Sequence, residues 1–194
     1  PLAICQNRLE MLMEDETLSE QQMGEIAKTC QTLEYVSKLN KSLLLLLKID
    51  NSQFASVEKV CLNEILYRYL DDYQEVYDYK GITLDVYEKN TFNITMNGTL
   101  AVVLITNLLK NAFVHNIYKG KIQIEITSSN IRFGNTGKDE HLDEKHIFER
   151  FYQGSKKEGS TGLGLAIVDA ICRQSQLSIQ YQFVKGWHWF DISC

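Results

Sequence analysis

Proline, paired cysteines and long apolar runs are all scarce in this chain of 194 residues. Its single proline is Pro1, so no proline interrupts the patterning of the remaining sequence. The five cysteines are odd in number and form no Cys-x-x-Cys pair, which argues against a disulfide framework or a zinc site. Apolar runs such as Leu43 to Leu47 are far too short to cross a bilayer. These absences predict a cytoplasmic chain with reduced thiols and no membrane contact of its own.

An excess of basic residues is also missing, because 20 Lys and Arg stand against 25 Asp and Glu. The resulting net charge of -5 disfavours general nucleic-acid binding, which needs a basic face to neutralise phosphates. Hydrophobic residues make up 44% of the chain, enough to bury a core. The length admits one large domain, or a small domain with a helical attachment.

The first quarter of the sequence predicts two helices. Apolar residues spaced three and four apart mark one narrow helical seam from Leu2 to about Glu14. Ser19 and Gln22 have the spacing of a capping box that opens a second helix, which continues to about Ile49. A hairpin with one thin apolar face cannot bury that face alone. We therefore expect residues 1–54 to pair with a second copy of the chain in a four-helix bundle.

Beyond turn-forming residues at 50–54, the patterning becomes a mixture of helices and strands. Helices are predicted at 62–79, 99–117 and 163–174, and strands at 82–86, 122–126, 131–133, 177–183 and 187–193. Strands that return in hairpin fashion beside three helices indicate an α/β sandwich with its helices on one face of the sheet. The predicted fold class is therefore α+β, with a helical hairpin at 1–54 and a sandwich at 55–194.

Two amides and a histidine follow helical spacing in the middle of this second region. Asn107, Asn111 and His115 lie four residues apart, so all three should project from one helix face. An amide oxygen is a hard ligand suited to Mg2+, which commonly shares the phosphates of a bound substrate. Taken alone, the triplet is more typical of surface amides that bind nothing.

A turn after the next strand carries Asn135-Thr-Gly137. The amide of Asn135 could accept a hydrogen bond from an adenine amine and donate one to a ring nitrogen, and Gly137 would permit close backbone approach. The alternative is a plain Asn-x-Gly turn.

The segment Thr161-Gly-Leu-Gly-Leu165 leads directly into an apolar helix. Glycines at a helix start let backbone N–H groups face an anion, assisted by the helix dipole. The segment is neither a P-loop nor a dinucleotide fingerprint, and the alternative is a glycine-rich loop without a ligand. The polar stretch from Arg150 to Ser160 before it has the composition of a mobile lid, with Phe148, Phe151 and Tyr152 packing at its near end.

These four segments, in this order and approximate spacing, resemble the N, G1, F and G2 boxes of bacterial sensor histidine kinases. The first fifty residues resemble the dimerisation and histidine-phosphotransfer hairpin of that family, and Pro1-Leu-Ala-Ile is similar to the end of its phosphoacceptor motif. The resemblance covers essentially the whole chain. It implies a hairpin followed by an ATP-binding sandwich of the histidine kinase, gyrase and chaperone type.

Carried over by position, the resemblance implies Asn111 as the Mg2+ ligand and Asn135 as the adenine-binding residue. It implies Arg150 and Lys156 as candidates for stabilising charge during phosphoryl transfer. The remaining nucleotide-binding candidates are Asn107, His115, Gly137, Tyr152, Thr161, Gly162, Leu163, Gly164 and Leu165.

Three positions depart from the family pattern. Asn135 replaces the usual Asp, Asp139 replaces the second glycine of the G1 box, and Val114 stands where many relatives carry Lys or Arg. These departures bear on nucleotide affinity, and Lys156 or Lys157 could supply the cation missing at Val114.

The implied activity is donation of the γ-phosphate of ATP·Mg2+ to a His on the hairpin, for relay to an Asp on a response-regulator receiver domain. All four histidines of this chain lie after residue 114. The acceptor His is therefore expected before Pro1, in a parent protein anchored in the inner membrane, and the chain itself is expected to bind ATP without autophosphorylation. The alternatives are an ATP hydrolase of the same superfamily, for which Asn107 offers no general base, and a dimerisation scaffold that binds no nucleotide.

Overall fold

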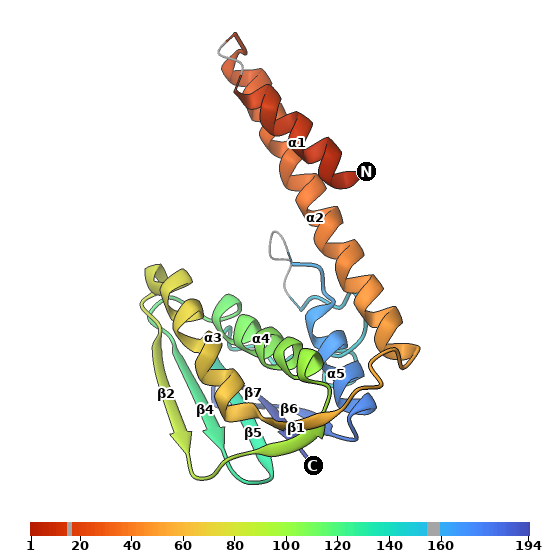
Figure 1. Ribbon diagram of the computed structural model, residues 1–194. Helices are drawn as coiled ribbons and strands as arrows, with labels where there is room; N and C mark the ends of the chain where they lie inside the picture. The colour runs from red at the N-terminus through yellow and green to blue at the C-terminus, as the bar shows by residue number, and fades with distance from the viewer. Residues whose placement is uncertain (15–16, 155–159) are drawn as a thin grey trace.

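The computed structural model describes residues 1–14, 17–154 and 160–194, and shows a helical hairpin projecting from an α/β sandwich (Figure 1). Helix α1 (Leu2–Met13) runs antiparallel to the longer α2 (Glu20–Asp50). The predicted capping box is present, because the Ser19 hydroxyl accepts from the backbone of Gln22 and the Gln22 side chain accepts from the backbone of Ser19. Both hairpin helices are confirmed to within two residues of their predicted ends.

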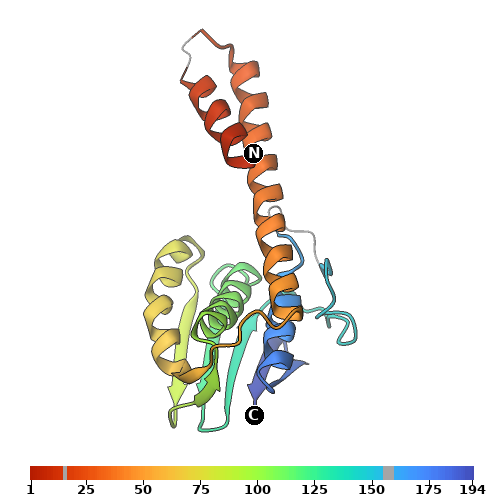
Figure 2. The same ribbon diagram turned by 45° about the vertical axis from the view of Figure 1, so that its right-hand side comes forward.

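The sandwich is built on a five-stranded sheet in the order β2-β4-β5-β7-β6. Strands β2 and β4 are parallel, and the other neighbours are antiparallel. The strand bounds are β2 Thr83–Glu88, β4 Lys121–Ile126, β5 Asn130–Thr136, β6 Ser178–Val184 and β7 Trp187–Ser193. Helices α3 (Leu62–Val76), α4 (Gly98–Val114) and α5 (Gly164–Gln174) cover one face of this sheet (Figures 1 and 2). The predicted α+β sandwich is confirmed.

Helix α4 forms the centre of the core. Leu104, Leu108 and Ala112 lie on its inner stripe and are essentially inaccessible to solvent. The helix contacts α3 on one side, α5 on the other and β5 beneath it. Because α4 is held on three sides, the residues on its remaining face have a fixed position, and that face carries Asn107 and Asn111.

Several element boundaries differ from the sequence prediction. A second, two-stranded sheet of β1 (Glu58–Cys61) and β3 (Asn93–Met96) was not predicted, because both strands are only four residues long. The helix predicted at 62–79 ends at Val76 and is followed by the 3-10 turn Asp78–Lys80. Strand β5 continues past the predicted end at residue 133, so Asn135 belongs to the strand and not to a turn after it.

The C-terminal half of α2 packs against the sandwich. Leu46 and Ile49 are buried in the common core, where α2 contacts α5. Asp50, the last residue of α2, accepts a 2.6 Å hydrogen bond from the Arg150 guanidinium. The hairpin is thus docked beside α5. Within the described ranges, no helix has both the length and the apolar character that a membrane span requires.

Candidate functional site

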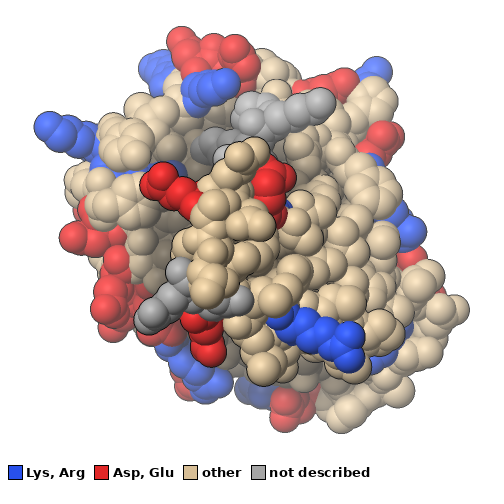
Figure 3. Space-filling model, turned by 90° about the horizontal axis from the view of Figure 1, so that it is seen from above, with Lys and Arg blue, Asp and Glu red and all other residues tan. Residues whose placement is uncertain are grey.

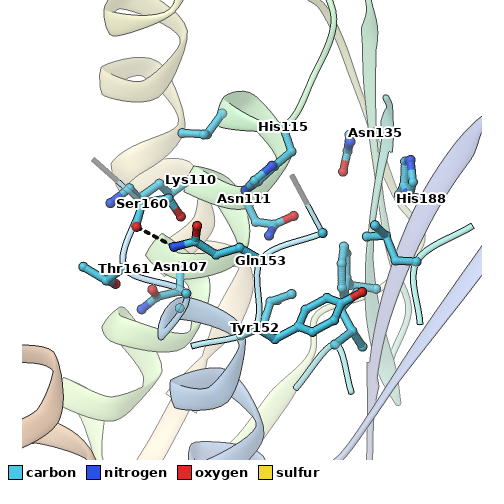
Figure 4. Close-up of a pocket in the computed structure, with 18 of the residues that line it drawn as sticks. Asn107, Lys110, Asn111, His115, Asn135, Tyr152, Gln153, Ser160, Thr161 and His188 are labelled. Atoms are coloured by element: carbon cyan, nitrogen blue, oxygen red, sulfur yellow. Dashed lines mark hydrogen bonds between the residues drawn. The ribbon is translucent and has the colours of Figure 1, made fainter. Parts of the chain in front are cut away.

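A cavity of about 520 Å³ opens between α4, the N-terminus of α5, the end of β5 and helix α2 (Figure 4). Segments far apart in the sequence contribute to its wall. The cavity is lined by nine of the residues selected from the sequence, namely Asn107, Asn111, His115, Asn135, Tyr152, Thr161, Gly162, Gly164 and Leu165. The structure therefore brings the four predicted motifs to one place.

The remaining candidates lie elsewhere. Leu163 is fully buried as the residue preceding α5, and Arg150 is turned away from the cavity toward Asp50. Gly137 lies behind the wall, where an added Cβ would come within 2.7 Å of the His188 ring, so glycine is needed there for packing. Lys156 and Lys157 lie outside the described residues, as do the other residues of the predicted lid between 155 and 159.

The wall formed by α4 presents amides one helical turn apart. The amide of Asn107 donates to the Val103 carbonyl at 2.8 Å, which fixes its rotamer and leaves its oxygen beside Gly164 of α5. The Asn111 side chain forms no hydrogen bond within the described part of the chain and points into the cavity (Figure 4). His115 follows at the C-cap, because α4 ends at Val114 and not at the predicted residue 117.

A buried lysine caps the C-terminal end of α4. The ammonium of Lys80 donates to the carbonyls of Phe113, Val114 and Asn116, at 2.8, 3.0 and 3.4 Å. The first two carbonyls belong to the end of the helix and the third lies just beyond it, where no further turn supplies N–H donors and the helix dipole favours a cation. Sequence reasoning did not identify this residue, because its partners lie more than thirty positions away.

Asn116 connects the end of α4 to the end of β5. Its side-chain oxygen accepts from the Thr136 hydroxyl at 2.7 Å, and its amide donates to the Lys121 carbonyl at 3.0 Å. An added Cβ on Gly120 would lie 2.1 Å from that oxygen, so the connection requires glycine at this position. The network sets the spacing between the two walls of the cavity, which carry Asn111 and Asn135.

Asn135 is 1% exposed, and one of its two polar atoms lacks a partner. The amide nitrogen donates to the Thr136 carbonyl at 3.0 Å, which orients the side chain. Its Oδ1 atom is buried and accepts no hydrogen bond from the described residues. A buried acceptor without a donor is costly, so the site is suited to a ligand that brings an N–H group.

His188 faces the cavity from β7, directly opposite Asn135 in the strand register. One ring nitrogen lies 2.8 Å from the Tyr181 hydroxyl and the other lies 3.0 Å from the Lys138 carbonyl, so both ring positions are fixed. Burial raises the pKa of Tyr181, which keeps its hydroxyl protonated. The alternation of β7, which places His188 on the same face as Phe190, could have identified this residue from sequence.

The N-terminus of α5 is braced by the segment before it. Gly162 has a φ of 67°, and an added Cβ would lie 2.8 Å from the Phe151 backbone. Phe151 also has a positive φ, and its N–H donates to the Gly162 carbonyl at 2.9 Å. The ends of the intervening loop are joined by Gln153, which donates to the Ser160 carbonyl (Figure 4). Gly164 and Leu165, the first residues of α5, line the cavity directly after this turn.

The aromatic segment differs in one respect from its prediction. Phe148 and Tyr152 pack against the core as expected, and the Tyr152 hydroxyl accepts from the backbone of Asp143. Phe151, however, is 57% exposed, because its left-handed backbone turns the side chain outward.

Charge around the cavity is mixed. Its described lining includes the basic residues Lys38, Lys110 and Lys138 and the acidic residue Glu140. Viewed from the side of the hairpin tip, acidic and basic side chains are interspersed over the surface (Figure 3). The local excess of lysines suits an anionic ligand, although the chain as a whole is acidic.

Known proteins resemble this chain in sequence. Residues 96–188 match the family of histidine kinase-, DNA gyrase B- and HSP90-like ATPases. The Heme sensor protein HssS of Staphylococcus epidermidis is 32% identical over 176 residues, which is 88% of this chain and 39% of that protein. The chain thus spans about two fifths of the length of this curated relative.

Solved structures share the architecture. The Acinetobacter baumannii histidine kinase AdeS superposes with a TM-score of 0.68 at 21% identity, over 99% of this chain and 93% of that chain. Histidine kinase ThkA, solved in complex with response regulator protein TrrA, superposes with a TM-score of 0.66 at 18% identity, over 98% and 55% of the two chains. These likenesses extend over the hairpin as well as the sandwich.

Proposed function

Since the chain belongs to the sensor histidine kinases of two-component signalling and carries their ATP-binding domain, we propose that its cavity holds ATP with Mg2+ and orients the γ-phosphate for transfer to a histidine. The observation that carries this proposal is the unpartnered Oδ1 of Asn135. The exocyclic amine of adenine is the N–H donor that this buried atom lacks.

The opposite end of the cavity is suited to phosphates. The N–H groups at the start of α5, after Gly162 and Gly164, provide an anion site. Asn111, whose amide has no hydrogen-bond partner among the described residues, would hold the metal ion through its oxygen. Bound Mg2+ would neutralise charge on the phosphates. The protein contributes position and electrostatic stabilisation, which are the main requirements of phosphoryl transfer.

The acceptor in this proposal is none of the four histidines in the chain. His188 is 7% exposed and hydrogen-bonded at both ring nitrogens, and helices α1 and α2 contain no histidine. We propose that the acceptor belongs to the hairpin of a longer, membrane-anchored protein, of which residues 1–54 and 55–194 form two cytoplasmic domains. A homodimer through the hairpin and relay to a response-regulator Asp complete the proposal, in keeping with the ThkA complex.

A calorimetric titration with a non-hydrolysable ATP analogue tests this function. The chain is expected to bind the analogue, and Mg2+ is expected to strengthen binding. Asn111→Ala should lower the affinity about tenfold with Mg2+ present and much less without it, since one charge-assisted contact is lost. Asn90→Ala, a change in an exposed loop, is the matched control. Absence of binding by the unaltered chain would favour a scaffold that binds no nucleotide.

A second measurement distinguishes the proposed kinase from an ATP hydrolase of the same superfamily. Steady release of phosphate from ATP by the purified chain, without any acceptor, would favour a hydrolase. The proposed kinase predicts negligible release, because Asn107 cannot act as a general base for water.

A further inference from the structure

Helix α2 contributes to the nucleotide cavity as well as to the hairpin. Lys38 and Ser42 line the cavity together with Asn107 and Lys110 of α4 and Thr161 before α5. Neither Lys38 nor Ser42 belongs to any motif recognised in the sequence. The wall of the cavity therefore includes two residues of the helical hairpin.

The position of these residues follows from helical periodicity. Lys38, Ser42 and Leu46 lie four residues apart, and Ile49 continues the same face. Leu46 and Ile49 are buried against the sandwich, and the Asp50–Arg150 ion pair holds the end of the helix at that contact. The last turns of this face of α2 pack against α5. The turns before them line the cavity.

The charge of Lys38 suits this location. Its side chain is exposed and forms no ion pair within the described ranges. Val114, at the end of α4, supplies no charge to the same cavity. Lys38 lines the same cavity as Gly164 and Leu165 at the start of α5, so an anionic group bound there would share this cavity with the Lys38 ammonium.

We propose that Lys38 is a phosphate-binding residue of the nucleotide site, supplied by the hairpin to the docked sandwich. This inference rests on the proposed function, because it takes a nucleoside triphosphate as the ligand. It makes nucleotide affinity dependent on the position of the hairpin. By thermodynamic reciprocity, a bound triphosphate stabilises the docked arrangement of α2 and α5.

The test compares ATP with adenosine, using calorimetry on the complete chain. Lys38→Ala should weaken binding of ATP about five- to tenfold, as expected for loss of one charge-assisted contact, and leave adenosine binding unchanged. Lys38→Arg should retain the affinity for ATP. The difference in ATP affinity between Lys38→Ala and the unaltered chain should shrink as the NaCl concentration rises from about 50 to about 500 mM, because salt screens exposed charges.

Lys41→Ala is the matched control, since Lys41 is an exposed lysine of the same helix that does not line the cavity. Equal ATP affinities for Lys38→Ala and Lys41→Ala would overturn the inference while leaving the proposed function in place. An equal loss of ATP and adenosine binding by Lys38→Ala would also overturn it, by indicating a structural effect. Failure of the unaltered chain to bind either compound would contradict the proposed function and this inference with it.

Discussion

Two buried polar side chains, Lys80 and Asn116, determine how the amides of α4 meet the strand that carries Asn135. Lys80 satisfies carbonyls at the end of the helix, and Asn116 joins that end to Thr136. Neither residue belongs to a nucleotide motif. Both act on the site indirectly, by fixing the separation of residues that face the ligand.

Replacement of Lys80 by methionine should destabilise the fold, because the aliphatic stem remains while buried carbonyls lose a donor. We expect the free energy of unfolding to fall by about 1 to 3 kcal/mol, the usual cost of leaving such groups unsatisfied. Urea unfolding followed by circular dichroism measures this change. Lys89→Met, at an exposed lysine, is the control. Equal stability of the two variants would show that the Lys80 contacts contribute nothing.

At the scale of elements, the segment between β5 and α5 has little regular structure, so its conformation depends on side-chain contacts. Asp143 and His146 form an ion pair there, and Glu149 lies 3.9 Å from the same imidazole. The hydrogen bond to Asp143 raises the pKa of His146, and the same bond lowers the pKa of Asp143.

This pair predicts a pH-dependent contribution to stability. Because the pKa of His146 is raised from its ordinary value of 6.5, the protonated imidazole stabilises the fold at pH values below 6.5. This stabilisation is lost as pH rises through the folded-state pKa. Because the pKa of Asp143 is lowered from its ordinary value of 3.8, the ionised carboxylate stabilises the fold at pH values above 3.8. This stabilisation is lost as pH falls through the folded-state pKa. The difference in melting temperature between the unaltered chain and His146→Gln should therefore be largest between these two values.

Repeating the comparison with Asp143→Asn in both chains provides the control. The effect of His146→Gln should then lose most of its pH dependence, leaving only the weaker influence of Glu149. A pH dependence that is unchanged by Asp143→Asn would contradict this assignment.

At the scale of the whole molecule, opposite faces of α2 differ in their exposure to solvent. Leu46 and Ile49 are buried against the sandwich, whereas Val36, Leu44 and Leu47 on the other side are 38%, 50% and 52% exposed. This second face continues the apolar seam expected to pair with another copy of the chain.

The proposed dimer predicts that the chain sediments at twice its monomer mass. Leu44→Glu should shift it toward monomer, because a carboxylate on the seam would be desolvated in the bundle. Nucleotide affinity should stay unchanged, since Leu44 does not line the cavity. Lys28→Glu, on an exposed surface of the same helix, is the control. A monomeric unaltered chain would contradict the proposed pairing.

Local patterning was sufficient to predict much of this molecule. The alternation in β4 and β7 and the spacing of buried residues in α4 are properties of neighbouring positions, and these elements were predicted closely. The pairing of β1 with β3 and of Arg150 with Asp50 joins distant segments, so no local pattern reveals it. The site was predicted at the level of its motifs, whereas the roles of Lys80 and Asn116 in shaping it required the folded chain.

The proposed function depends most on recognition of adenine by Asn135. One N–H of its amide donates to the Thr136 carbonyl, which orients the side chain, and its buried Oδ1 accepts no hydrogen bond from the described residues. Guanine places a carbonyl oxygen where adenine carries its amine, and two acceptors cannot pair.

A calorimetric comparison of non-hydrolysable ATP and GTP analogues, each with Mg2+, tests this claim most directly. We predict measurable binding of the adenine nucleotide, at least about tenfold tighter than that of the guanine nucleotide. Equal affinities for the two nucleotides, or no binding of either, would contradict it.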